Sequence, residues 1–323
     1  MKRCVVGVVW AVLSSAPAPG RADQPVVSCE SLARLELREA TVTLATTVAA
    51  GKFDVPAQSF GGPGGPGGPG GPGGPGGPGR PAGGGPPPGR MPTPFGSSDA
   101  IQPGFCRVAV TMTPSGDSDI KMEVWLPLSG WNGKFLGAGS FGWGGAILYD
   151  GLLLGVKNGY AVANNDTGHS DPAGFGRFAL GHPDKVVDYG YRANHEMTLQ
   201  AKAIIKAFYG AAPEHSYWLG CSLGGQQGMT EAQRFPNDYD GVVVGAPASP
   251  ITRLNAWQIW PSVLISQDPA RAIPQSKGAM VNQAILDECD ALDGIEDGIL
   301  ENPPRCRSIP GNCCARVQTP PIA

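Results

Sequence analysis

A single serine stands in a setting that could make it a nucleophile. The pentapeptide Gly220-Cys221-Ser222-Leu223-Gly224 has the pattern G-x-S-x-G, and it follows an apolar segment. A serine nucleophile needs a sharp turn that exposes its hydroxyl, and only small residues fit two positions before and after it. We therefore predict that Ser222 is a catalytic nucleophile. Because the chain contains 49 glycines, an ordinary loop serine is the alternative.

The segments on either side of Ser222 favour the elements that such a turn requires. Tyr217, Trp218 and Leu219 have high β-propensity and precede the turn, whereas residues 226–234 are rich in helix-favouring side chains. A strand followed by a helix is the context in which α/β-hydrolases hold their nucleophile. The local pattern thus favours the catalytic interpretation.

A glycine-rich loop could supply the second part of such a site. The sequence GAGSFGWGG follows the strand-like segment Trp131–Leu136. In a serine hydrolase, a loop of this kind can place a backbone N–H against the oxyanion that develops on the ester carbonyl. We expect the N–H groups of Leu223 and Gly142 to be the two donors. A close-packed turn without a catalytic role is the alternative.

The chain offers no histidine where an α/β-hydrolase requires its general base. In that fold the catalytic residues follow the order serine, acid, histidine, but all four histidines precede Ser222. They are His169, His182, His195 and His215. We predict that His169 and His195 are buried and hydrogen-bonded. The later acids Asp268 and Asp287 belong to a segment that we expect to form a lid.

The remaining elements alternate in the manner of an α/β protein. Period-two alternation predicts half-buried strands at residues 105–110 and 119–127, and the apolar run at 240–247 predicts a buried parallel strand. Further strands are expected at residues 40–49 and 160–163, and helices at residues 152–160, 189–209 and after Ser222. This order predicts a parallel-type sheet with helices on both faces.

Composition and the N-terminus bear on where the protein works. A net charge of −3 offers no basic surface for nucleic acid, and no apolar run reaches the length of about 20 residues that spans a bilayer. Lys2 and Arg3, the apolar segment 4–13 and the small residues that follow have the order of an export signal. We expect residues 1–22 to be a signal peptide and the protein to be secreted or periplasmic. A buried first strand is the alternative.

A glycine- and proline-rich segment interrupts the N-terminal part of the chain. The triplet GGP occurs six times between residues 61 and 78, and further glycines and prolines follow to about residue 90. The period of three superficially suggests collagen, but glycine in place of proline raises the entropy of the unfolded chain. We therefore predict a disordered insertion at residues 61–90 rather than a triple helix.

Three sequence blocks carry a resemblance to a known family. They are NNDTGHSD from Asn164, DYGYRANHEMTLQAKAIIKAFYG from Asp188, and SYWLGCSLGGQQGMTEAQRFPNDYDGVVVGAPAS from Ser216. Together with FCRVAV, EVWLP and WNGKFLG upstream, they resemble the tannase and feruloyl esterase family, which includes mono(2-hydroxyethyl) terephthalate hydrolases. The likeness extends over most of residues 28–307 outside the Gly/Pro segment.

The resemblance implies an α/β-hydrolase domain with a lid inserted after the strand that ends near Gly245. It also implies a Ser, Asp, His triad that hydrolyses small esters of aromatic acids. The implied organisation places hydrolase segments at residues 23–60 and 91–249, on either side of the 61–90 insertion, and a partial lid at 250–323.

The family resemblance also gives Cys221 a role. In these enzymes the cysteine before the nucleophile bonds to a cysteine that follows the catalytic histidine, so the expected partner of Cys221 is absent here. A structural or unpaired cysteine is the alternative. We further expect disulfides between Cys29 and Cys106 and between Cys289 and Cys306, although the sequence alone does not determine the connectivity.

A calcium site in the lid is likewise implied. Asp290, Asp293 and Asp297 are separated by glycines and other residues in a spacing that can bring several hard oxygens together, as calcium requires. By likeness to the family, Ca²⁺ would be bound by these three carboxylates and by the backbone carbonyls of Ile295 and Ile299. An acidic, solvated turn is the alternative.

The last residues depart from the family, whose members continue further and show a Phe-Asp-Pro segment near this point. A shift of one base in a plausible coding sequence for RFDP would produce the RSIP that begins at Arg307 here. We therefore expect a truncated chain, and without the downstream Asp and His we expect little or no esterase activity. A non-catalytic secreted binding module is the alternative. The sequence predicts no oligomeric state.

Overall fold

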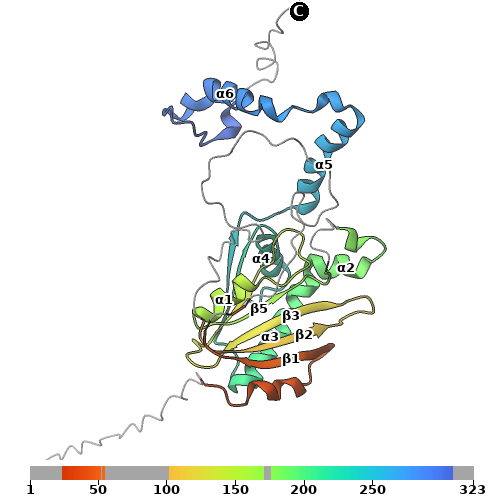
Figure 1. The fold of residues 1–323 in the computed structure, drawn as a ribbon, viewed down its shortest axis with the longest axis vertical. Helices are drawn as coiled ribbons and strands as arrows, with labels where there is room; N and C mark the ends of the chain where they lie inside the picture. The colour runs from red at the N-terminus through yellow and green to blue at the C-terminus, as the bar shows by residue number, and fades with distance from the viewer. Residues whose placement is uncertain (1–23, 52, 55–101, 171–175, 308–323) are drawn as a thin grey trace, which may run out of the picture. The chain divides into compact units, whose positions relative to one another are not determined.

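The structure is a computed structural model that describes residues 24–51, 53–54, 102–170 and 176–307. The predicted signal peptide, the Gly/Pro insertion and the tail expected to follow a frameshift lie outside the described residues. The chain divides into two compact units, Met1–Ile251 and Thr252–Ala323. The first unit holds a β-sheet, and the second is helical (Figure 1).

The described residues of the first unit form a seven-stranded mixed sheet in the order β1-β2-β3-β5-β4-β6-β7. β1, β2, β3 and β5 pair in antiparallel fashion, whereas β5, β4, β6 and β7 run parallel. The strands are β1 (Ala40–Val48), β2 (Phe105–Met112), β3 (Ile120–Pro127), β4 (Lys134–Ala138), β5 (Ala161–Asn165), β6 (His215–Cys221) and β7 (Gly241–Gly245). The parallel half is the part that the alternation of strands and helices predicts.

Helices connect the parallel strands. The longest of them in the first unit, α3, ends at Gly210, whose φ of 72° is the left-handed conformation that glycine adopts at helix ends. A π-helical turn, η3, directly precedes α3. The helical elements are η1 (Cys29–Arg34), α1 (Tyr149–Lys157), η2 (Arg177–Ala179), α2 (Pro183–Val187), η3 (Asp188–Arg192), α3 (Ala193–Tyr209) and α4 (Leu223–Arg234).

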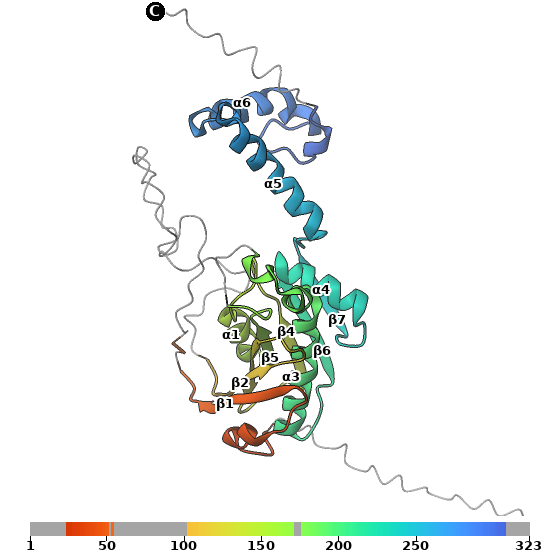
Figure 2. The same ribbon diagram turned by 90° about the vertical axis from the view of Figure 1, so that its right-hand side faces the viewer.

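Alternating side chains along the strands divide the core into two layers. One layer, on the α1 face, contains Leu136 and Val162, and the other, on the α3 face, contains Phe135 and Trp218. Successive residues of a strand point to opposite faces, which explains why neighbours such as Phe135 and Leu136 belong to different layers. Figure 2 shows α1 and α3 on opposite sides of the sheet. Helices on both faces are therefore confirmed.

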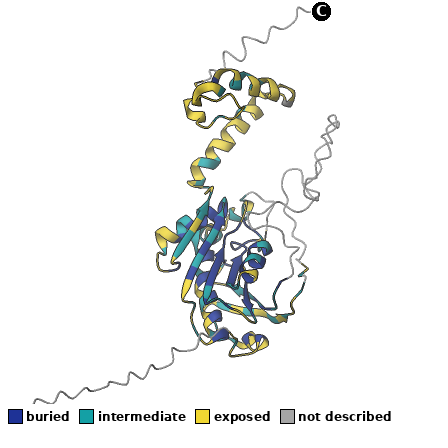
Figure 3. Cartoon of the chain, turned by 90° about the vertical axis from the view of Figure 1, so that its left-hand side faces the viewer, coloured by how far each residue is buried: buried dark blue, intermediate teal, exposed yellow. Residues whose placement is uncertain are grey.

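The apolar stripe predicted for α3 is its buried face. The five side chains of the stripe have no exposed surface, namely those of Met197, Ala201, Ile204, Ile205 and Phe208. Their spacing of three and four residues places them on one side of the helix. Buried residues are correspondingly concentrated in the sheet and at its contacts with the helices (Figure 3).

Two strand predictions are wrong about burial. The run of valines in β7 predicts a buried strand, but Val243 is 61% exposed. Among the described strands β7 lies at the end of the sheet and pairs with β6 alone, so its outer side has no neighbour to cover it. Conversely, β3 is buried on both faces from Met122 to Pro127, because it lies between β2 and β5 and contacts both α1 and α3.

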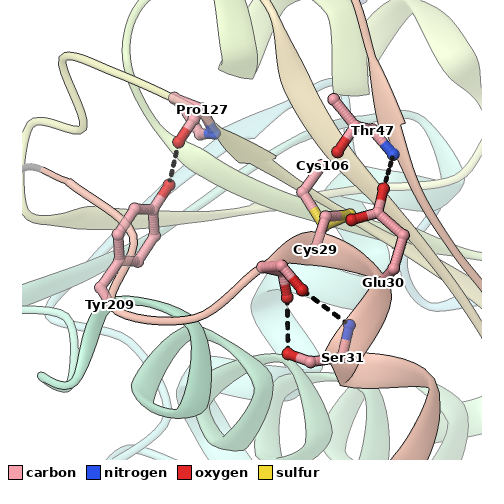
Figure 4. The surroundings of a disulfide bond; sticks show 8 residues. Cys29, Glu30, Ser31, Thr47, Cys106, Pro127 and Tyr209 are labelled. Atoms are coloured by element: carbon pink, nitrogen blue, oxygen red, sulfur yellow. Dashed lines mark hydrogen bonds between the residues drawn. A yellow bond between two sulfur atoms is a disulfide. The ribbon is translucent and has the colours of Figure 1, made fainter.

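A disulfide between Cys29 and Cys106 joins η1 to β2, as predicted (Figure 4). The Glu30 carboxylate reinforces this junction by accepting the N–H of Thr47 in β1 at 3.0 Å. The two cysteines are 77 positions apart, and the closed loop includes the Gly/Pro segment. Cross-linking a loop of this length restricts the unfolded chain and stabilises the fold by about 4 kcal/mol.

The second unit is small and helical. The helix α5 begins at Ile251, the last residue of the first unit. The helical elements from there onward are α5 (Ile251–Gln267), η4 (Pro269–Arg271), η5 (Gln275–Lys277), α6 (Gly278–Cys289), η6 (Asp290–Asp293) and η7 (Pro303–Arg305). The predicted disulfide between Cys289 and Cys306 is present. Trp257 and Trp260 are 72% and 64% exposed. None of the helices in the described part of the chain has the length and apolarity of a membrane span.

Candidate active site

Ser222 lies at the turn between β6 and α4, in the strand-turn-helix context that the sequence predicts. Its backbone has φ 59° and ψ −116°, a conformation that residues with a side chain rarely adopt. Such strain persists only where the surrounding structure enforces it, and it is concentrated at functional sites. The same sharp turn exposes the nucleophile in α/β-hydrolases.

Glycines make this turn possible because the backbone passes too close for other side chains. A Cβ atom on Gly220 would lie 2.2 Å from the carbonyl oxygen of Gly224, and one on Gly224 would lie 2.9 Å from the carbonyl oxygen of Ser140. A Cβ atom on Gly225 would lie 2.5 Å from the carbonyl oxygen of Gly245. The predicted need for small residues on both sides of the turn is thereby confirmed.

Hydrogen bonds from two strands hold the turn in place. The N–H of Ser222 donates to the carbonyl oxygen of Gly245 at 3.0 Å, and the N–H of Ala248 donates to the carbonyl oxygen of Ser222 at 3.0 Å. From β6, Trp218 Nε1 donates to the carbonyl oxygen of Gly224 at 2.9 Å. The strained turn is thus fixed between the end of β7 and the side chain of a fully buried tryptophan.

The glycine-rich loop after β4 packs against the turn. A Cβ atom on Gly139 would lie 2.5 Å from the Cα of Gly224. The N–H of Ser140 donates to Gln227 Oε1 in α4 at 2.8 Å. Backbone contact of this closeness is possible only between two glycines, so the loop and the first turn of α4 are positioned together.

The two predicted oxyanion donors lie on these two segments. Leu223 is the first residue of α4, so its N–H has no partner within the helix and lies at the positive end of the helix dipole. Gly142 has φ 59° and is exposed, two residues beyond the contact at Ser140. The role of both N–H groups in catalysis stays a prediction.

Polar residues at the end of β5 anchor the glycine-rich loop. Asn164 Oδ1 accepts the N–H of Leu148 at 2.6 Å, and Asn164 Nδ2 donates to the carbonyl oxygen of Ala138 at 2.6 Å. The N–H of Gly145 donates to the carbonyl oxygen of Asp166 at 2.8 Å. The sequence-based prediction assigns no role to these residues. In the sequence they could be recognised as a polar cluster directly after a buried strand. The carboxyl end of that strand lies at the same end of the parallel strands as Ser222.

Asp166 is a buried carboxyl group beneath this loop. Asp166 is 5% exposed, and its Oδ1 accepts hydrogen bonds from the backbone N–H groups of Lys121 at 3.0 Å and Gly168 at 2.9 Å. Burial raises the pKa of Asp166 to about 7, because desolvation of the charged form outweighs the two hydrogen bonds that favour it. Its charge therefore changes near neutral pH.

In the described part of the chain the Ser222 hydroxyl has no hydrogen-bond partner, a histidine included. His169 is buried, with Nε2 2.9 Å from the carbonyl oxygen of Trp143. His195 Nδ1 lies 2.6 Å from Asp238 Oδ2, with its side chain 26% exposed. Hydrogen bonding is confirmed for both, and full burial only for His169. His182 and His215 are exposed, near Asp117 and Asp240 respectively.

Comparison with known sequences places this arrangement in a family. The sequence profile of the family described as "Tannase and feruloyl esterase" matches residues 106–319. This chain belongs to the tannase and feruloyl esterase family. The match explains why the turn at Ser222, the loop after β4 and the block after β5 occur together.

The names of two relatives of this chain describe them as esterases. The chain is 37% identical over 225 residues to an uncharacterised esterase of Xanthomonas campestris pv. campestris, with 69% of this chain and 39% of that protein covered. It is 38% identical over 207 residues to a probable feruloyl esterase B-1 of Aspergillus fumigatus, with 64% of this chain and 38% of that protein covered. The chain therefore spans less than half the length of these relatives.

Solved structures agree with the family assignment. The structure of feruloyl esterase B from Aspergillus oryzae superposes with a TM-score of 0.67 at 32% identity, covering 87% of this chain and 49% of that one. Tannin acyl hydrolase from Aspergillus niger superposes with a TM-score of 0.56 at 20% identity, covering 84% of this chain and 44% of that one. The second likeness shows the fold alone, and both support the predicted α/β-hydrolase class.

Cys221, next to Ser222, is a free thiol in the part of the chain that the structure describes. It is half-buried and has no disulfide partner among the described residues. Its Sγ faces the end of β7, where it would lie 3.4 Å from a Cβ atom on Gly245.

The acidic loop after α6 has oxygen donors that suit calcium. Each aspartate accepts a backbone N–H: Asp290 from Gly298 at 3.0 Å, Asp293 from Ile295 at 2.9 Å and Asp297 from Ile299 at 3.0 Å. Among the described residues these three carboxylates do not converge to within 4.8 Å of one another. Carboxylate and carbonyl oxygens are the ligands that calcium prefers, so the chemistry of the loop fits this ion. For all three carboxylates to bind one ion, their side chains would have to rotate away from the backbone N–H groups that they now accept.

Proposed function

We propose that this chain carries the nucleophile of a serine carboxylic ester hydrolase that acts on small esters of aromatic acids. The observation that carries the proposal is the positive φ of Ser222, on a turn where no side chain fits at Gly220 or Gly224. The names of the relatives, an esterase and a probable feruloyl esterase, support an ester substrate with an aromatic acyl group.

The proposed reaction begins with attack of Ser222 Oγ on the ester carbonyl carbon. The N–H groups of Leu223 and Gly142 would donate to the carbonyl oxygen as it gains negative charge. The bond to the alcohol then breaks, the alcohol leaves with a proton, and water hydrolyses the acyl group from the serine. A general base must accept the proton of the Ser222 hydroxyl during the first step.

The histidines of this chain are poor candidates for that base. His169 and His195 interact with Trp143 and Asp238, and among the described residues none of the four histidines hydrogen-bonds to Ser222. Loss of the base and its acid lowers the rate of a serine hydrolase by several orders of magnitude. We therefore expect this chain by itself to turn over esters very slowly or not at all.

The nucleophile can be tested without turnover. Incubation with 4-nitrophenyl acetate should slowly add one acetyl group to the peptide that contains Ser222, as read by mass spectrometry. The Ser222→Ala variant should lack the adduct, whereas Ser129→Ala, which changes an exposed serine, should keep it. An adduct that persists in Ser222→Ala would exclude Ser222 as the nucleophile.

Turnover is a separate measurement. Hydrolysis of methyl ferulate, methyl gallate and 4-nitrophenyl acetate is expected to stay at the level of the Ser222→Ala variant. Sustained hydrolysis that the Ser222→Ala change abolishes would contradict the proposed inactivity and would show that this chain contains its own base. The ranking of the two methyl esters would then identify the preferred acyl group.

We also propose that the loop from Asp290 to Ile299 binds calcium. The carboxylates of Asp290, Asp293 and Asp297 and the carbonyls of Ile295 and Ile299 would be the ligands. Calcium that binds only the folded protein should raise the melting temperature. Asp297→Asn should reduce that shift, and Glu296→Gln, at an exposed residue of the same loop, should leave it unchanged. The absence of any shift would favour a solvated acidic turn.

Export is the third part of the proposal. The two disulfides support an oxidising compartment, and residues 1–22 have the order of a signal peptide. Expression of the full chain in a bacterial host should give a periplasmic or secreted product whose N-terminal sequencing begins near residue 23. A product that retains Met1 in the cytoplasm would count against export.

A further inference from the structure

Three ionisable side chains meet on the α3 side of the sheet, away from the turn at Ser222. They are His195 of α3, Glu231 of α4 and Asp238, which follows α4. One potential ligand atom of each lies within 4.8 Å of the others, and no second group of this kind occurs among the described residues. Glu231 follows Ser222 by nine positions, which corresponds to roughly 13 Å along the helix axis.

Glu231 is the unusual member of this cluster. The residue is 1% exposed, and neither of its carboxylate oxygens has a hydrogen-bond donor. Asp238, 7% exposed, directs Oδ2 to His195 Nδ1 at 2.6 Å. A buried carboxylate without a donor is unfavourable, and a second carboxylate beside it makes the site more negative still. Either a shared proton or a bound cation between the two acids would offset this negative charge.

The nearest lysine does not satisfy that demand. Lys202 Nζ donates to the backbone carbonyl oxygen of Asp238 and makes no hydrogen bond to either carboxylate. Its charge offsets part of the negative potential from a distance. Both oxygens of Glu231 remain available to a ligand.

We propose that His195, Glu231 and Asp238 bind a divalent transition-metal ion of the zinc class. An imidazole nitrogen with two carboxylate oxygens is a ligand set that zinc accepts, whereas magnesium and calcium prefer oxygen alone. The ion would neutralise both acids and give Glu231 the partner that it lacks. It would also connect α3 to α4 and to the segment before β7.

The surroundings of His195 suit such a role. Phe235 stacks on the imidazole with ring centroids 3.8 Å apart, which fixes the orientation of the ring. The side chain of His195 is 26% exposed, so solvent reaches the imidazole itself. An imidazole whose ring is oriented by its neighbours suits the role of a metal ligand. This proposal is independent of esterase activity.

Zinc binding to the full chain tests the proposal directly. Protein freed of metal with a chelator should bind one equivalent of zinc in this cluster, measured by titration calorimetry and elemental analysis. Glu231→Gln should weaken that binding by at least about 100-fold, since loss of even an outer partner of a metal ligand typically costs about 10- to 100-fold. Glu196→Gln, which changes a neighbouring acid on α3, should bind as the wild type does.

Cobalt(II) provides a second readout that needs no variant. A site of one histidine and two carboxylates should give weak visible absorption bands without the intense thiolate band that Cys221 ligation would produce. Two outcomes would overturn the proposal: the absence of stoichiometric zinc and cobalt binding, or equal zinc affinity in Glu231→Gln and the wild type. If Glu231→Gln instead raises the melting temperature while zinc leaves the wild type unchanged, the acids share a proton and the site is not a metal site.

Discussion

The two ends of α4 are built by opposite means. At its start, Ser222 is held in a strained conformation by backbone contacts between glycines and by hydrogen bonds from β7. Towards its end, Glu231 is held among side chains that come from α3 and from the segment before β7. The turn at the start of α4 forms only because the glycines around Ser222 carry no Cβ atom. The cluster near the end of α4 forms because the fold brings ionisable side chains of different elements together.

The largest effect should come from adding a Cβ atom at the backbone-built end. In Gly220→Ala the new atom would meet the carbonyl oxygen of Gly224 at 2.2 Å, and the turn must shift to accept it. We expect a loss of about 3 kcal/mol or more in the free energy of unfolding, measured with urea.

Gly190→Ala is the matched control, because a Cβ atom there meets nothing within 4 Å. It should lie within about 1 kcal/mol of the wild type. Equal stabilities of the two variants would show that the turn is not sterically constrained.

A smaller effect is expected at the buried carboxyl group of Asp166, next to the glycine-rich loop. The pKa of Asp166 is raised to about 7, so the folded protein keeps a proton that the unfolded chain releases near pH 4. The unfolded state therefore binds fewer protons between these values, and stability must fall as the pH rises through this window. Between pH 5 and 7 we expect a loss of about 2 kcal/mol from this group.

Asp166→Asn isolates that contribution. An asparagine Oδ1 can still accept the N–H groups of Lys121 and Gly168, both of which now bond to Oδ1, and the variant cannot ionise. Its stability should be flatter with pH than that of the wild type. Asp119→Asn, at an exposed carboxylate nearby, should keep the wild-type slope. An unchanged slope in Asp166→Asn would assign the pH dependence to other groups.

The strain at Ser222 should be measurable by comparing two replacements. Both Ser222→Gly and Ser222→Ala remove the hydroxyl, but only glycine adopts a positive φ without a steric penalty. We expect Ser222→Gly to exceed Ser222→Ala in unfolding free energy by about 1 kcal/mol. If the alanine variant is the more stable of the two, the turn is not strained in the way that its φ indicates.

The smallest effect should be at the edge of the sheet. Val243 in β7 is 61% exposed, so Val243→Thr should change the unfolding free energy by less than about 0.5 kcal/mol. The same change at Val124 in β3, which has no exposed surface, should cost at least about 1 kcal/mol because it buries a hydroxyl. Similar losses at both positions would mean that β7 is covered in solution.

Residue pattern alone predicted the features that depend on neighbours in the chain. The turn at Ser222 was predictable because a short run of residues must satisfy one steric requirement. The buried face of α3 was predictable because its apolar residues repeat every three to four positions. The pairing of Cys29 with Cys106 was expected only through the family resemblance, since spacing does not specify connectivity.

Tertiary structure decided the features that join distant segments. The burial of β3 and the exposure of β7 follow from their places in the sheet, although the alternation in β3 predicts a half-buried strand and the valine run in β7 predicts a buried one. His195 and Asp238 are 43 positions apart, and their contact depends on how α3 and α4 pack on the same face. The physical reason is that local sterics act over a few residues, whereas burial and charge pairing depend on which segments the fold brings together.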